Sequence, residues 1–134
     1  MGDPATRIAE ELELLRKWFG DIQFEPTGNW FLIPNDARAS VHGWSPKPFP
    51  VAFHAQPGHP GAVPYGIYVR SDARVGSAPP ANFEASASNR PPFPGEWGVL
   101  SWSIDGWFAK ADVREGSNLL GFVLSFEERY RSGP

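Results

Sequence analysis

The side chains in this sequence that could act as nucleophiles are hydroxyls, because its 134 residues include no cysteine. Ser101 and Ser103 lie in an aromatic segment close to the carboxylate of Asp105. A serine hydroxyl is a weak nucleophile until a neighbouring base takes its proton. Ser103 and Ser101 are therefore candidate nucleophiles, with Asp105 or a histidine as the base. The alternative interpretation is that both serines are strand or turn residues that flank a core tryptophan.

Other kinds of site have little support in the sequence. The three histidines are His42, His54 and His59, and a Ser-His-Asp triad could be drawn from Ser103, His59 and Asp105. Such residues occur in most sequences, so the triad carries little weight. Without cysteine there is no thiolate ligand, and we expect no metal site. Walker, nucleophile-elbow and dinucleotide motifs are also missing, so we expect no cofactor.

Length and charge indicate one ordinary globular domain. The 134 residues are 41% hydrophobic and carry a formal net charge of −3, which predicts a single domain spanning residues 1–134. No basic block would attract phosphates, so nucleic acid is not an expected partner. No apolar run approaches the roughly 20 residues of a membrane span, and the N-terminal stretch lacks a signal-peptide core. We therefore expect a cytoplasmic protein without a membrane partner.

Helices are predicted at both ends of the chain, with short strands between them. Asp3 and Pro4 suit a helix start, and the spacing of the following apolar residues predicts a helix over 4–19. A second helix is predicted over 118–130, with Ser117 as its cap. The predicted strands are 22–25, 30–33, 39–44, 50–55 and 66–70. A long Pro- and Ser-rich loop is predicted over 76–96. This order predicts an α+β fold with helices on one side of an antiparallel sheet.

The segment from His54 to Val69 carries prolines at 57, 60 and 64. It resembles the "Tyr-Pro … Pro-Pro" link between the third and fourth strands of ubiquitin-conjugating (E2, UBC) and RWD-type domains. His59-Pro60 would stand in the place of Tyr-Pro, and Val63-Pro64 in the place of the later proline. The resemblance implies a UBC/RWD-like fold with an N-terminal helix, an antiparallel meander and a C-terminal helix.

A second stretch extends the resemblance toward the C-terminus. Trp107 precedes the predicted helix that starts at Asn118, as a tryptophan precedes such a helix in E2 proteins. The run Leu100–Ser103 resembles the Trp-Ser segment of a divergent bacterial E2-like group. That group occurs beside E1-like adenylating enzymes, ubiquitin-like proteins and deconjugating peptidases. Two family features are missing, namely the catalytic cysteine and the His-Pro-Asn motif.

The resemblance implies a carrier that accepts a ubiquitin-like C-terminus from an E1-like enzyme and passes it to a target lysine. Because there is no cysteine, the carrier would be a serine oxyester on Ser103 or Ser101. The first helix would receive the E1-like enzyme through Arg7, Arg16 and Lys17, although charges on a helix's polar face usually only meet solvent.

Two alternatives remain open at this point. The first is a non-catalytic E2-variant or RWD-like binding module. The second is an unrelated small α+β protein, such as an immunity or ligand-binding protein, with the 76–96 loop over a pocket.

Overall fold

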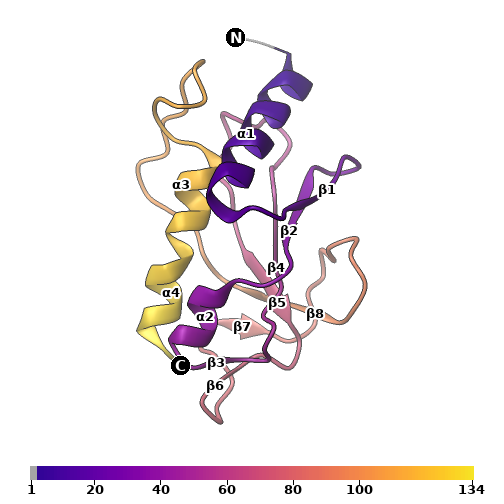
Figure 1. The fold of residues 1–134 in the computed structure, drawn as a ribbon, viewed down its shortest axis with the longest axis vertical. Helices are drawn as coiled ribbons and strands as arrows, with labels where there is room; N and C mark the ends of the chain where they lie inside the picture. Colours follow the sequence, from indigo (N-terminus) through magenta and orange to yellow (C-terminus); the bar gives the residue numbers. More distant parts are fainter. Residues whose placement is uncertain (1–2) are drawn as a thin grey trace.

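The first helix, α1 (Pro4–Phe19), has the bounds that the sequence predicts. The computed structural model describes residues 3–134, and Figure 1 traces them from α1 to the C-terminal helices. Proline occupies the first turn of α1, where its missing N–H is not needed. Gly20 ends the helix with φ of 73°, and its N–H donates to the Arg16 carbonyl at 2.9 Å. The apolar side of α1 is buried through Ile8 and Leu15.

The main sheet is antiparallel throughout and has the strand order β1-β2-β4-β5-β8-β7. The strands are β1 (Gln23–Glu25), β2 (Trp30–Ile33), β4 (Val51–His54), β5 (Ile67–Arg70), β7 (Phe83–Glu84) and β8 (Trp97–Leu100). β1 and β2 correspond to the strands predicted over 22–25 and 30–33, and the structure pairs them as a hairpin. The shortest strands, β1 and β7, form the two edges.

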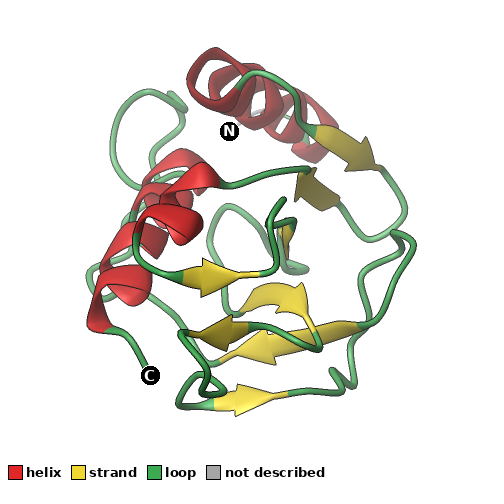
Figure 2. Cartoon of the chain, turned by 60° about the horizontal axis from the view of Figure 1, so that its bottom comes forward, coloured by secondary structure: helices red, strands yellow, loops and turns green. Residues whose placement is uncertain are grey.

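Alternating residues of these strands divide between two apolar clusters, as the two-residue period of a strand requires. The larger cluster joins the sheet to the helices and includes Phe31, Phe53, Val69, Phe122 and Tyr130. The smaller cluster lies on the opposite face and contains the intervening strand residues, which are Trp30, Leu32, Ala52, Tyr68 and Trp97. Figure 2 shows the helices gathered along one side of the sheet.

The prediction of a strand over 39–44 is wrong. Residues Ala37–Val41 form a short helix, α2, and only Trp44–Ser45 is extended, as β3. The Asp36 carboxylate accepts a hydrogen bond from the Arg38 N–H at 3.3 Å, which caps α2 and turns the chain into a helix. β3 pairs with β6 (Arg74–Val75) in a separate two-stranded sheet.

The closing helix is present but is divided into α3 (Leu119–Leu124) and α4 (Phe126–Ser132). Its cap is Asn118 and not Ser117, because the Asn118 side chain accepts from the Gly121 N–H at 2.8 Å. The break lies at Ser125, whose hydroxyl donates to the Phe122 carbonyl. A serine bonded to its own helix in this way commonly bends it.

The predicted 76–96 loop is irregular except for the two residues of β7. Its residues Ala87 and Phe93 pack on the outer face of the sheet. The architecture is therefore α+β, with an N-terminal helix, an antiparallel sheet and C-terminal helices. Among the described residues, no helix has the length and apolar character needed to cross a membrane.

Candidate functional site

Two irregular segments, residues 60–66 and 101–107, lie side by side and run in opposite directions. The Gly66 N–H donates to the Trp102 carbonyl at 2.8 Å, and the Trp107 indole N–H donates to the Pro60 carbonyl at 2.7 Å. These bonds fasten the Pro-rich link to the segment that holds both candidate serines. The sequence predicts the two segments separately and gives no sign that they meet.

Ser101 follows the last residue of β8, and its side chain is exposed. Its Oγ lies 2.7 Å from the hydroxyl of Tyr65, which is itself 46% exposed. The backbone N–H of Ser101 donates to the Asn82 carbonyl at 3.0 Å. Ser101 is therefore held in place and keeps its hydroxyl at the surface beside a second hydroxyl. Sequence reasoning did not select Tyr65, because nothing local marks a tyrosine as the partner of a serine 36 positions later.

Ser103 is also exposed, but its hydroxyl donates to the Pro64 carbonyl at 3.1 Å. A backbone carbonyl accepts a hydrogen bond without taking the proton, so this contact holds the segment and does not activate the oxygen. Asp105 is exposed and, within residues 3–134, neither a hydrogen bond nor an ion pair joins it to Ser101 or Ser103. The two candidate serines thus differ in their surroundings, because the Ser101 hydroxyl contacts another hydroxyl and the Ser103 hydroxyl contacts a backbone carbonyl.

The histidines are engaged elsewhere. His59 Nε2 lies 2.8 Å from Glu11 Oε2, and His42 Nε2 lies 3.2 Å from Glu127 Oε2. His54 stacks on Trp30 with ring centroids 4.3 Å apart, and burial lowers its pKa below the ordinary histidine value. Within the part of the chain that the structure describes, no histidine is hydrogen-bonded to Ser101 or Ser103, and the triad of Ser103, His59 and Asp105 is not assembled.

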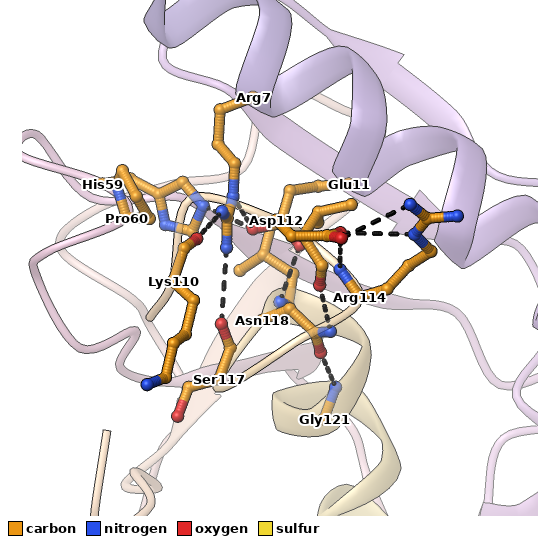
Figure 3. A network of polar contacts seen from close by, with 12 residues as sticks. Arg7, Glu11, His59, Pro60, Lys110, Asp112, Arg114, Ser117, Asn118 and Gly121 are labelled. Carbon is orange, nitrogen blue, oxygen red and sulfur yellow. Dashed lines mark hydrogen bonds and ion pairs between the residues drawn. The ribbon is translucent and has the colours of Figure 1, made fainter. Parts of the chain in front are cut away.

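A buried network joins α1 to two distant segments (Figure 3). The Glu11 side chain is 0% exposed, and its Oε2 accepts from Arg7 Nε at 3.0 Å and from His59 Nε2. Its other oxygen, Oε1, accepts from the Leu119 N–H at 2.9 Å. The carboxylate thus connects the first helix, the His59-Pro60 link and the start of α3. The sequence missed this role because glutamates on helices usually face water.

Arg7, predicted as a contact for an E1-like enzyme, lies within this network and is 5% exposed. Besides Glu11, its guanidinium donates to the carbonyls of Lys110 and Ser117. The hydrogen-bond donors of Arg7 are therefore used within the fold. Arg16 and Lys17 are exposed on the last turns of α1, and Arg16 donates to the Ile22 carbonyl at 2.9 Å. That α1 contacts an E1-like enzyme stays a prediction. Of the three basic residues predicted for this contact, Lys17 is the least engaged by the fold.

The same network shapes the loop before α3 (Figure 3). Asn118 Nδ2 donates to the Val113 carbonyl at 2.8 Å while its oxygen caps α3. At the tip of this loop, Arg114 donates to Asp112 and lowers the pKa of that carboxyl below its ordinary value. Nearer the base, Phe108 is 73% exposed. The loop therefore has a fixed base and presents a large apolar side chain, Phe108, to solvent.

Among residues 3–134, no group of three or more His, Asp and Glu side chains is arranged to hold a metal ion. Comparisons of the chain with protein-family models, curated proteins and solved structures found no match.

Proposed function

We propose that this chain is a distant E2-like protein that carries a ubiquitin-like C-terminus as an oxyester on Ser101. It would receive the acyl group from an E1-like adenylating enzyme and pass it to a lysine of a target protein. The order of elements supports a UBC/RWD-like assignment. The Pro-rich link joins β4 to β5, which are the third and fourth strands of the main sheet in chain order from β1.

One observation carries the choice of carrier residue. The exposed hydroxyl of Ser101 contacts a group that can both accept and donate hydrogen bonds, the Tyr65 hydroxyl at 2.7 Å. The Ser103 hydroxyl, by contrast, donates to the backbone carbonyl of Pro64. Ser101 is thus the better of the two serines predicted from the sequence, and Asp105 is not needed in the proposal.

The proposal predicts a covalent adduct of defined chemistry. Incubating the purified chain with an E1-like enzyme, a ubiquitin-like protein and ATP should give an adduct that resists thiol reductant and is cleaved by hydroxylamine or base. Ser101→Ala should abolish the adduct, and Ser103→Ala, the matched control two residues away, should retain it. Gel shift and mass spectrometry measure adduct formation in both variants. An adduct that survives Ser101→Ala would rule out Ser101 as the carrier.

A second candidate function is a non-catalytic E2-variant or RWD-like binding module. Exposed apolar side chains near the serine segment favour it, namely Val63 at 39%, Tyr65 at 46% and Phe108 at 73% exposure. Aromatic residues on a fixed backbone are typical centres of protein interfaces. This function predicts a stable complex with an E1-like or ubiquitin-like protein and no covalent adduct. Pull-down combined with the adduct assay separates the two functions.

A further inference from the structure

Tyr65 occupies a position that is fixed from both sides along the chain. Pro64 before it is buried, and its carbonyl accepts from the Ser103 hydroxyl at 3.1 Å. Gly66 after it donates to the Trp102 carbonyl at 2.8 Å. The φ of Gly66 is 92°, a conformation that favours glycine. A Cβ at this position would also lie 3.2 Å from Val99 Cγ2. The backbone therefore directs the Tyr65 side chain, although the ring itself is half exposed.

The Tyr65 hydroxyl meets the oxygen that would react. Its distance of 2.7 Å from Ser101 Oγ is a normal hydrogen bond between hydroxyls. A phenol oxygen can accept one hydrogen bond while its O–H donates another, and Tyr65 also reaches solvent because it is 46% exposed. A path for a proton thus runs from Ser101 through Tyr65 to water.

We propose that Tyr65 is a catalytic residue that takes the proton of Ser101 during acyl transfer, an inference that rests on the proposed carrier function. Ser101 Oγ attacks the carbonyl carbon of an acyl adenylate, and the new carbon–oxygen ester bond forms. The bond between that carbon and the phosphate oxygen breaks, and AMP leaves with the electron pair. The Ser101 proton passes to the Tyr65 oxygen while the phenol's own proton passes to water.

The test uses the full chain and a small acyl donor, so that it does not depend on any conjugation partner. Acetyl adenylate is added to the wild type and to Tyr65→Phe, Ser101→Ala and Ser77→Ala, and mass spectrometry measures the rate and site of acetylation. Proton transfer by a positioned side chain commonly contributes roughly 10²–10⁴-fold, so we expect Tyr65→Phe to slow acetylation of Ser101 by at least about tenfold. Ser77→Ala, the matched control at an exposed serine beside the separate two-stranded sheet, should retain the wild-type rate.

Two results would overturn the role of Tyr65. One is an equal rate of Ser101 acetylation in Tyr65→Phe and the wild type, and the other is wild-type acetylation that does not occur at Ser101. Thermal unfolding of each variant shows whether a slower rate reflects loss of the fold. If Tyr65→Phe slows acetylation but no adduct forms with a ubiquitin-like protein, the carrier function fails while the action of Tyr65 on Ser101 stands.

Discussion

The carboxylate of Asp36 is 3% exposed and is fully engaged by its neighbours. It accepts from Arg38 Nε at 2.8 Å and Nη2 at 2.7 Å, and from the Tyr130 hydroxyl at 2.9 Å. The Arg38 guanidinium also lies 5.0 Å from the Phe19 ring centroid and donates to the Val123 carbonyl. A buried ion pair is tolerated when further hydrogen bonds satisfy both charges, as they do here.

Tyr130 gives this cluster a dependence on alkaline pH. Burial raises its pKa well above the ordinary value of 10.0, and the nearby Asp36 carboxylate acts in the same direction. Above about pH 10 the unfolded chain therefore releases a proton that the folded chain retains, so this contribution to stability is complete below that pH and is lost as pH rises.

Tyr130→Phe should remove that dependence. Near neutral pH it should cost about 1 kcal/mol for the lost hydrogen bond. Above about pH 10 the wild type should lose stability relative to the variant by up to about 1.4 kcal/mol per pH unit, so the stability gap between them should close and then reverse. Urea unfolding measures both proteins, and the raised pKa of Tyr68 affects them equally. If the wild type and Tyr130→Phe lose stability equally over this alkaline range, the role assigned to Tyr130 is contradicted.

At the scale of elements, α1 is attached to the rest of the fold by more than its apolar face. The Glu11 carboxylate joins it to His59 and to the first N–H of α3, while Arg7 joins it to the loop before α3. These contacts hold the Pro-rich link at its His59 end, and the bonds from Gly66 and Ser103 hold it at the other. The position of Tyr65 thus depends on elements far from it in the sequence.

Glu11→Ala should destabilise the protein strongly. It removes the acceptor of Arg7 Nε, His59 Nε2 and the Leu119 N–H in a buried site, and the loss of one partner of a buried ion pair commonly costs about 3–5 kcal/mol. Denaturant unfolding gives the free energy. The matched control is Glu10→Ala, an exposed neighbour on the same helix, which should change stability by no more than about 0.5 kcal/mol.

If Glu11→Ala does not fold, Glu11→Gln provides the measurement. The amide keeps the shape of the side chain but lacks the charge, so a loss smaller than that of a full truncation is expected. A loss no larger than that of Glu10→Ala would show that the buried network does not hold α1.

At the scale of the whole molecule, the elements predicted correctly from the sequence are those that local periodicity determines. Helix 4–19 and the strands predicted over 22–25 and 30–33 follow from apolar spacing and residue type, and all three are present. The strand at 39–44 failed because a cap on Asp36 outweighed the extended preference of the residues. Candidate serines could be selected by residue type, but their surroundings could not.

The missed parts of the candidate site depend on contacts between distant positions. Glu11 meets His59 and Leu119 across 48 and 108 positions, and Tyr65 meets Ser101 across 36. Periodicity within one element contains no information about such pairs. One sequence alone therefore predicts a hydroxyl nucleophile but not which hydroxyl accompanies it.

The two edges of the main sheet affect how copies of the chain meet in concentrated solution. β1 has three residues and β7 has two, so each edge offers few unpaired amides and carbonyls to a neighbouring chain. Pro26 follows β1 directly and lacks the N–H that an added strand would require. Short, interrupted edges of this kind oppose strand addition between molecules, and hence protect the sheet against aggregation.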